Sequence, residues 1–378
     1  MKYFLLVLIS SFSVLTFSQQ TETIITDSTI IYYGRQYFLI EGTTILDSLK
    51  ESPYDRLPIS YKEKVREPVW DLSKASAGIT VRFHSNSTSI NLKWTVLNDF
   101  DMPHMASTGI KGIDLYTKYN NKWRYVTTAG AIVGLKKYQN KSKPLDSISE
   151  FELIKNMTPE FREYKLFLPL YDGVTKLEVG IDPTASIEKA SPSSVKPIVF
   201  YGTSITQGGC ASRPGMAHTS IISRKLDMEC INYGFSGNGR MEIPIVELIS
   251  EISASFYVIE CLQNMDSDQV KQRVRPLVET IRKKHPLTPI VLVENMMYKM
   301  AFLDQTIQDE LIQENVTLKN EFDKILKSGD QNIFYVKDNQ DNLLDNEGTV
   351  DGVHLTDLGF LRYADYLLKN FKNYKLIN

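Results

Sequence analysis

An apolar run ends in a glycine turn and a serine in the segment Ile198-Val199-Phe200-Tyr201-Gly202-Thr203-Ser204-Ile205-Thr206. A short apolar run bounded by a turn is typical of a buried strand. Far along the chain, the segment Asp351-Gly352-Val353-His354 places a carboxylate and an imidazole three residues apart. Together these two segments contain the three side chains of a nucleophilic serine site.

Each of these side chains has a chemical role in such a site. Ser204 becomes a good nucleophile only when a base removes its proton, and His354 can act as that base near neutral pH. Asp351 can hold the imidazole in the required tautomer and stabilise its protonated form. A spacing of three residues lets the carboxylate reach one ring nitrogen while the other faces the serine.

Two segments between these ends could donate hydrogen bonds to an oxyanion. The segment Phe235-Ser236-Gly237-Asn238-Gly239 follows the apolar run 230–233, and no side chain would obstruct a backbone N–H at Gly237. The segment Leu262-Gln263-Asn264-Met265 follows the run 256–259 and offers the Asn264 side-chain amide. We therefore expect these segments to complete the site.

The order Ser, Gly, Asn and Asp-x-x-His in residues 196–378 resembles the SGNH subclass of the GDSL esterase/lipase superfamily. The resemblance implies that Ser204 is the nucleophile and that His354 and Asp351 complete a catalytic triad. It also implies an oxyanion hole made by the Ser204 N–H, the Gly237 N–H and the Asn264 side chain.

The sequence departs from the family pattern at two positions. Thr203 stands where the family name has aspartate, which leaves the serine intact, and Leu262 stands where glycine is usual, which affects the placement of Asn264. The G-x-S-x-G elbow of α/β-hydrolases is absent, because no glycine stands two residues after Ser204.

Taken singly, each of these signals is also compatible with a structural role. A serine after a strand is commonly a helix N-cap. Asp351 and His354 could form a capping pair or part of a metal site. Their joint occurrence in this order, each after a predicted strand, favours the catalytic interpretation.

Apolar runs alternate with helical patterns along residues 198–378. This alternation predicts a flavodoxin-like parallel sheet with helices on both faces, in which ligands bind beyond the carboxyl ends of the strands. The predicted strands are 198–201, 230–233, 256–259, 290–293 and 333–336. The predicted helices are 216–226, 242–252, 268–284, 307–327 and 356–371.

Short alternating runs dominate residues 19–182 and predict an all-β sandwich domain. The runs 79–83 and 89–94 form one candidate hairpin, and the runs 164–170 and 175–181 form another. Proline and serine then give residues 183–197 the composition of a linker between the two domains.

The segment Gly112-Ile113-Asp114-Leu115-Tyr116 is similar to the G-x-D-L-Y signature of a domain that often precedes SGNH hydrolases in bacterial exported proteins. The similarity extends over residues 27–182. We interpret Asp114 as a structural carboxylate rather than a catalytic group.

Residues 1–18 have the features of a secretory signal peptide, with Lys2 before an apolar run and small residues at its end. No later run is apolar for long enough to span a bilayer, so we expect an exported chain, periplasmic or secreted. A net charge of −2 over 378 residues offers no electrostatic case for binding nucleic acid.

The sequence also bears on thiols and metals. Cys210, Cys230 and Cys261 are too few for a disulfide scaffold, and buried free thiols are favoured over a bridge from Cys210. The acidic stretch 338–351 does not match an EF-hand loop, which favours a solvated loop over a calcium site. The predicted chemistry needs no metal and no organic cofactor.

Three further residues are candidates for contacting the substrate. The loop 98–105 carries Asp101 and His104, and we expect it to lean over the pocket. Arg213 could hold a polar leaving group, with an ordinary surface charge as the alternative.

These features predict an exported serine ester hydrolase that works through an acyl-serine intermediate and removes acetyl or other small acyl groups from carbohydrates. Its partner would be a small-molecule or glycan ester. A lipid or lysophospholipid esterase is the nearest alternative. A non-catalytic glycan-binding protein on a hydrolase fold and an acyltransferase with the same triad also stay open.

Overall fold

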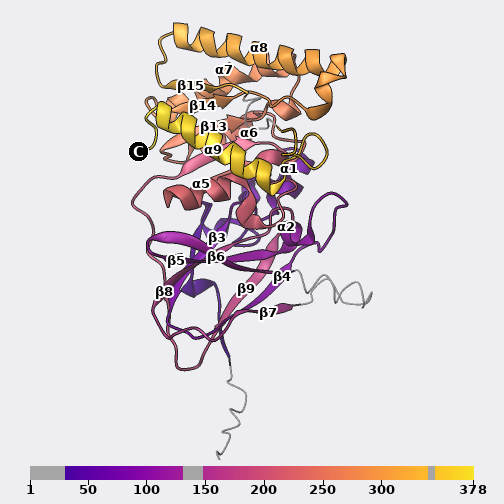
Figure 1. Ribbon diagram of the computed structural model, residues 1–378. Coiled ribbons are helices and arrows are strands. Elements are labelled where there is room, and N and C mark those ends of the chain that lie inside the picture. Colours follow the sequence, from indigo (N-terminus) through magenta and orange to yellow (C-terminus); the bar gives the residue numbers. More distant parts are fainter. Residues whose placement is uncertain (1–29, 131–147, 339–344) are drawn as a thin grey trace, which may run out of the picture.

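The structure is a computed structural model that describes residues 30–130, 148–338 and 345–378. An N-terminal β-sandwich lies below a C-terminal α/β domain in Figure 1. This arrangement confirms the predicted fold class. The predicted signal peptide, residues 1–18, lies outside the described residues.

The C-terminal domain is built on a five-stranded sheet in which every neighbouring pair is parallel. The strand order is β12-β11-β13-β14-β15, which is the flavodoxin-like order 2-1-3-4-5. The strands are β11 (Ile198–Gly202), β12 (Cys230–Gly234), β13 (Phe256–Glu260), β14 (Ile290–Val293) and β15 (Ile333–Val336). All five coincide with predicted strands to within one residue.

Helices cover both faces of this sheet, as predicted. One face packs against α6 (Ile243–Ser250), α7 (Ser267–Lys284) and α8 (Gln305–Lys327), and the other against α5 (His218–Leu226) and α9 (Asp357–Asn373). The inner face of α9 shows the helical spacing behind this packing, since its buried side chains recur every three or four residues. They are Phe360, Tyr363, Ala364, Leu367 and Phe371.

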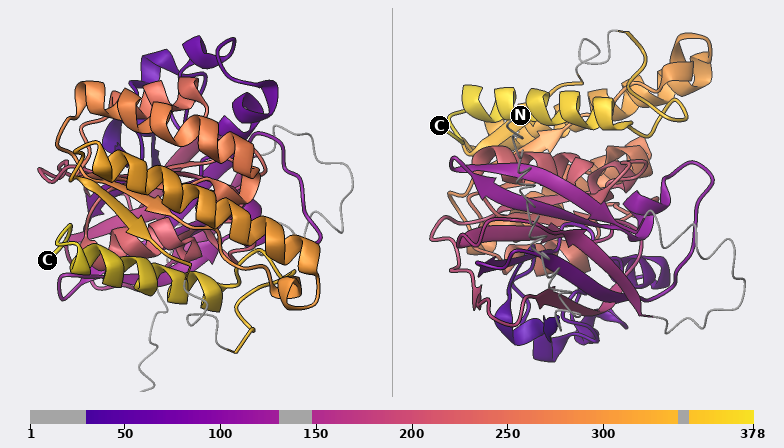
Figure 2. Two further views of the ribbon diagram at one scale, coloured as in Figure 1. Left: turned by 90° about the horizontal axis from the view of Figure 1, so that it is seen from above. Right: turned by 60° about the horizontal axis from the view of Figure 1, so that its bottom comes forward.

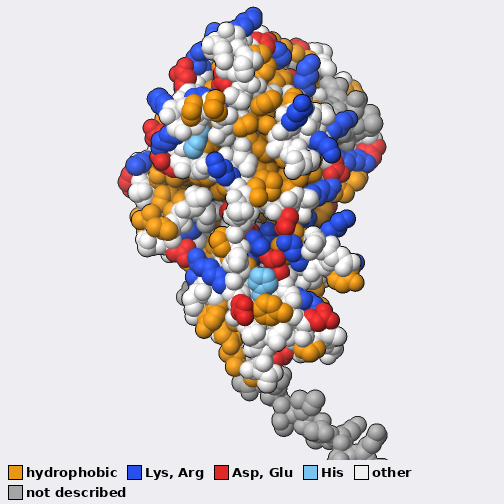
Figure 3. Space-filling view, turned by 90° about the vertical axis from the view of Figure 1, so that its left-hand side faces the viewer, with side chains coloured by type: hydrophobic (Ala, Val, Ile, Leu, Met, Phe, Trp, Pro, Cys, Tyr) orange, Lys and Arg blue, Asp and Glu red, His pale blue; other side chains and the backbone are white. Residues whose placement is uncertain are grey.

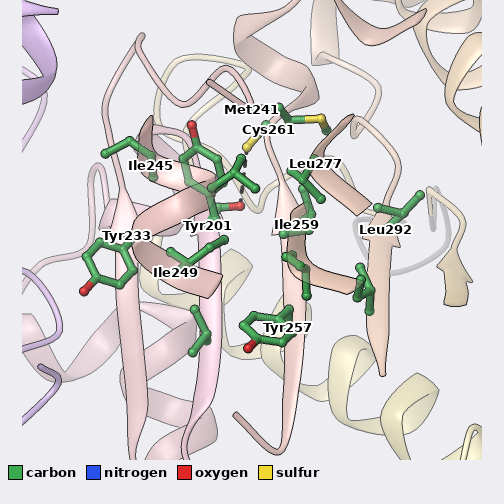
Figure 4. Close-up of a cluster of buried hydrophobic side chains, with 14 of the residues drawn as sticks. Tyr201, Tyr233, Met241, Ile245, Ile249, Tyr257, Ile259, Cys261, Leu277 and Leu292 are labelled. Atoms are coloured by element: carbon green, nitrogen blue, oxygen red, sulfur yellow. Dashed lines mark hydrogen bonds between the residues drawn. The ribbon is translucent and has the colours of Figure 1, made fainter. Parts of the chain in front are cut away.

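The strand β11 lies between β12 and β13, and its side chains alternate between the two faces. Val199 and Tyr201 belong to the core shown in Figure 4, whereas Ile198 and Phe200 belong to the core on the opposite face. Because both faces are covered, the strand is a continuous apolar run rather than an alternating one. Burial of each such side chain stabilises the fold by about 1.5–3 kcal/mol.

The sandwich consists of two antiparallel sheets (Figure 2, right). Side chains from both sheets form one core. One sheet has the order β1-β9-β4-β7, from β1 (Ile31–Tyr33), β9 (Val174–Ile181), β4 (Ile90–Val96) and β7 (Ser149–Ile154). The other has the order β10-β3-β8-β5-β6, with β2 also paired to β3. It is formed by β2 (Leu39–Glu41), β3 (Thr80–Ser85), β5 (Ile113–Tyr119), β6 (Lys122–Ala129), β8 (Arg162–Phe167) and β10 (Ile187–Lys189).

Both predicted hairpins are wrong, although their strands exist. β3 and β4 lie in different sheets, and so do β8 and β9. Alternation of apolar and polar residues shows that one face of a strand is buried, but it does not distinguish lateral pairing from packing across a sandwich. Each connection therefore crosses from one sheet to the other.

The segment predicted to be a linker contains a strand, and the N-terminal domain has short helices in addition to its two sheets. Residues 187–189 of the expected linker form β10, which pairs with β3 and extends the sandwich sheet. The N-terminal domain also contains α1 (Glu67–Ser73) and α2 (Ser107–Lys111).

Short 3-10 helices occur in both domains. They are η1 (Arg35–Tyr37), η2 (Asp47–Leu49), η3 (Ile59–Tyr61), η4 (Pro214–Met216), η5 (Leu262–Asn264) and η6 (Lys299–Phe302).

A segment of the N-terminal domain packs directly against the parallel sheet. Val69 and Trp70 of α1 belong to the same core as Tyr201. The guanidinium of Arg56 is almost completely buried and donates to the carbonyl oxygens of Asn232 (3.3 Å) and Gly234 (2.6 Å) on β12. The edge strand β12 is thus covered by the N-terminal domain.

Within the described ranges, the structure contains no helix with the length and apolar character needed to cross a membrane.

Candidate active site

The candidate nucleophile lies at the turn between β11 and a short helix. Ser204 is the first residue of α4 (Ser204–Gln207), and it is 7% exposed. Thr203 before it has an extended backbone. A Cβ on Gly239 would lie 1.8 Å from the carbonyl oxygen of Gly202, so only glycine lets the neighbouring loop approach this turn so closely.

A second loop brings the acid and the imidazole to Ser204. The backbone turns at Gly352, whose φ of +88° favours glycine. Asp351 Oδ1 accepts from the backbone N–H groups of Val353 (3.0 Å) and His354 (2.8 Å), and Oδ2 lies 2.7 Å from His354 Nδ1. Burial opposes ionisation of Asp351, but these hydrogen bonds outweigh it and hold the pKa of the carboxyl below its usual value.

The other ring nitrogen of His354 faces the serine. His354 Nε2 lies 2.9 Å from Ser204 Oγ. Because the carboxylate of Asp351 accepts from Nδ1, Nε2 is assigned as the unprotonated nitrogen that can take the serine proton. The structure therefore brings the three predicted residues together in the geometry of a charge-assisted triad.

The segments predicted to supply oxyanion donors adjoin the same turn. The Phe235 N–H donates to the carbonyl of Gly202 (3.0 Å), and the Gly239 N–H donates to Oδ1 of Asn264 (3.2 Å). The second bond leaves the Asn264 amide nitrogen to donate elsewhere. A Cβ at Gly237 would meet nothing within 4 Å, so this part of the loop faces open space.

The third expected donor is the N–H of Ser204. It stands at the N-terminus of α4, where the first N–H groups have no partner within the helix. Such groups are suited to stabilise negative charge on an oxygen.

A buried polar network beneath α4 was not predicted from the sequence. Glu260, at the end of β13, accepts from Thr206 (2.9 Å) and Tyr363 (2.7 Å) and lies 3.1 Å from His218 Nε2. Burial disfavours its charge, but His218 and the hydrogen bonds hold the pKa of Glu260 below its usual value. The available signal was a single carboxylate at the end of an otherwise apolar strand.

Tyr171 was not predicted from the sequence either. It extends from the sandwich domain, and its hydroxyl lies 3.5 Å from the carbonyl oxygen of Ser204. Burial raises the pKa of this phenol, so it stays protonated and can donate. Nothing in the local sequence distinguishes it from an ordinary core tyrosine.

The loop 98–105 reaches the site through only one of its two candidate residues. The ring of His104 lies 5.9 Å from the ring of His354, between centroids. Asp101 instead accepts from Ser107 (2.7 Å) and pairs with Lys111 (3.0 Å). These contacts hold the loop in place, and a contact of Asp101 with the substrate stays a prediction.

Arg213 is also engaged by protein groups rather than facing solvent freely. Its guanidinium donates to Asp114 Oδ2 (2.6 Å) and to Tyr116 Oη (2.6 Å). Asp114 is fully buried and also accepts from the Gly215 N–H (2.8 Å). The G-x-D-L-Y segment therefore holds the loop that follows the serine, in agreement with a structural role for Asp114.

All three cysteines are buried and free, as predicted. Cys210 lies in the loop after α4, close to both His104 and His354.

Comparisons with known proteins agree with this architecture. Residues 195–372 match the GDSL-like Lipase/Acylhydrolase family, and residues 31–187 match the N-terminus of Esterase_SGNH_hydro-type proteins. The search of curated proteins found no match.

Solved structures extend the similarity over both domains. A protein from Bacteroides ovatus that was assigned as a GDSL-like lipase is 31% identical, with a TM-score of 0.83 over 92% of this chain and 99% of that chain. A salicylyl-acyltransferase from a tetracycline biosynthetic pathway is 15% identical, with a TM-score of 0.73 over 92% and 98%. A family two carbohydrate esterase from Clostridium thermocellum is 13% identical, with a TM-score of 0.56 over 80% and 94%.

A flavodoxin-like sheet with serine, glycine, asparagine and histidine segments at the carboxyl ends of its strands defines the class of SGNH hydrolases. The chain belongs to the GDSL-like lipase/acylhydrolase family and carries its GxDLY-type N-terminal domain.

Proposed function

We propose that this member of the family is an exported serine esterase that removes acetyl or other small acyl groups from carbohydrates. The observation that carries the catalytic part is the continuous chain of contacts from Asp351 through His354 to Ser204, at 2.7 Å and 2.9 Å. An esterase is also what the family and its structural neighbours support.

The proposed reaction has two stages. His354 Nε2 takes the proton of Ser204 as Oγ attacks the ester carbonyl, and the protonated ring then donates to the departing alcohol. Water, activated by the same nitrogen, hydrolyses the acyl-serine. In both stages the N–H groups of Ser204 and Gly237 and the amide of Asn264 stabilise the oxyanion, while Asp351 stabilises the imidazolium.

Different observations support the proposal of a carbohydrate substrate. A signal peptide is expected at residues 1–18, and carbohydrate esterases share the fold of both domains. His104 places a polar, exposed ring from the sandwich beside the site, where a sugar hydroxyl could bind. Acidic and basic side chains are interspersed on the face shown in Figure 3, and the net charge of −2 gives no electrostatic support for a polyanionic substrate.

The decisive experiment compares the wild type with Ser204→Ala on p-nitrophenyl acetate, butyrate and a long-chain ester, and on an acetylated oligosaccharide. We expect the variant to lose at least 1,000-fold in kcat, since the triad acts through this oxygen. Ser193→Ala, an exposed serine before the parallel sheet, is the control and should stay active. Preference for the long chain would favour a lipid esterase, and two inert proteins would favour a glycan-binding function.

Acyl transfer is a second candidate because a salicylyl-acyltransferase resembles both domains of this chain. Transfer and hydrolysis share the acyl-serine and differ in whether a sugar hydroxyl or water attacks it. Product analysis with an acylated donor and a sugar acceptor separates them, since a transferase would form more acylated acceptor than free acid.

A further inference from the structure

Three potential metal ligands converge at the mouth of the candidate site. The ring nitrogens of His104 and His354 and the Sγ of Cys210 lie within 4.8 Å of one another. These residues come from the sandwich loop, the loop before α9 and the loop after α4. The described part of the chain has no other group of three or more such side chains with this spacing.

The chemistry of this set suits a borderline-soft divalent cation. Two imidazoles and one thiolate are the ligands of a three-residue zinc site that leaves a fourth position for water. In a tetrahedral zinc site, ligand atoms stand roughly 3.5 Å apart. The cluster would therefore have to close by roughly 1 Å, and His104, exposed on a surface loop, can make that movement.

The local charge also favours a cation. The carboxylate of Asp351 contacts His354, one of the three residues, and would attract a bound cation. The cation would in turn stabilise the thiolate of Cys210. The carboxylate of Asp351 and the thiolate of Cys210 carry one negative charge each, so a divalent ion would neutralise both.

We propose that His104, Cys210 and His354 bind one Zn²⁺ ion reversibly, and that the bound ion blocks the site. Formation of the Zn–S bond breaks the S–H bond of Cys210 and releases its proton to solvent. His354 binds through Nε2, because Nδ1 is engaged by Asp351. The contact between Nε2 and Ser204 Oγ is therefore lost.

Zinc binding can be measured without ester hydrolysis in the Ser204→Ala chain, which retains all three ligands. Calorimetric titration with zinc chloride should give one ion per chain, and Cys210→Ala or His104→Ala in this background should weaken binding at least tenfold. Cobalt as a probe should show a thiolate charge-transfer band that disappears in Cys210→Ala but persists in His104→Ala.

Two variants serve as matched controls. Cys230→Ala removes a buried thiol from β12, and His84→Ala removes a histidine that stacks on Phe161 in the sandwich. Both should bind zinc like the parent. Equal affinity in the ligand variants and the controls, or equal loss in both groups, would overturn the zinc site.

The blocking effect rests on the proposed function and needs the wild-type enzyme. Zinc should inhibit ester hydrolysis, EDTA should restore it, and His104→Ala should need at least tenfold more zinc for half inhibition, relative to its own zinc-free rate. Zinc binding without inhibition would overturn the blocking role. A wild type inactive without zinc would count against the proposed function, while the titration would still decide the metal site.

Discussion

At the scale of single residues, the site depends on groups that each serve two partners. Asp351 orients the imidazole with one oxygen and its own loop with the other. Asn264 accepts from the Gly239 N–H with its oxygen, which aims its nitrogen away from that loop. Positions of this kind hold a catalytic group before substrate arrives, so little reorganisation is needed in the transition state.

Asn264→Ala should lower kcat by about 100- to 1,000-fold and change KM little, because the amide would act on the oxyanion more than on the bound ester. Steady-state kinetics on p-nitrophenyl acetate measures both parameters. Asn238→Ala is the control, since its side chain faces Arg66 and Ser236 and should cost less than tenfold. Unchanged kcat in Asn264→Ala would remove this residue from the oxyanion hole.

At the scale of elements, β5 of the sandwich holds the loop that follows the candidate nucleophile. Asp114 on β5 accepts from Arg213 and Gly215 of that loop and from Thr128 of β6. Burial raises the pKa of Asp114 despite these partners. The G-x-D-L-Y segment thus acts as an anchor between domains.

Asp114→Ala should lower the free energy of unfolding by about 3 kcal/mol, because Arg213, the Gly215 N–H and Thr128 all lose their buried acceptor. Chemical denaturation measures this difference. Asp365→Asn breaks an exposed pair with Lys225 and should cost less than about 1 kcal/mol. A large fall in kcat at unchanged stability would instead assign Asp114 to catalysis.

At the scale of the whole molecule, the two domains share buried polar contacts as well as a core. Arg56 reaches β12 from the N-terminal domain, and Glu229, just before β12, accepts from the Gly42 N–H (2.7 Å). Burial is the main reason that the pKa of Glu229 rises to about 7, and the nearby Glu41 adds to it. We therefore expect the free energy of unfolding of the protein to depend on pH near neutrality.

The sign follows from the raised pKa. The folded chain holds the Glu229 proton more tightly than the unfolded chain, so this contribution is complete below about pH 4.5 and is lost as pH rises through about 7. Glu229→Gln keeps an oxygen for Gly42 and cannot ionise. It should become more stable than the wild type, by roughly 2–3 kcal/mol at pH 8 and by little at pH 5.

Thermal or chemical unfolding of both proteins at several pH values measures this difference. Glu188→Gln, on an exposed position of β10, should show no such pH-dependent gap. A gap for Glu229→Gln that is constant with pH would contradict the assignment.

Local sequence was sufficient for the parallel sheet and for the contact between Asp351 and His354, whereas the position of Ser204 beside His354 was expected from the family resemblance. The five strands are buried on both faces, so each appears as a continuous run, and the serine, glycine and asparagine segments directly follow the carboxyl ends of three of them. The Asp351–His354 contact was predictable because three residues separate its partners. These features depend on neighbours along the chain, which the sequence displays.

Other features depended on which distant segments meet in space. The runs expected to pair as hairpins lie in different sheets. Arg213 donates to Asp114 instead of lying on a free surface, and Glu260 contacts His218 and Tyr363. The sequence specifies the burial and polarity of each residue, but many pairings satisfy the same pattern. Only the packed structure selects one, because side-chain contacts between remote segments depend on how whole sheets and helices fit together.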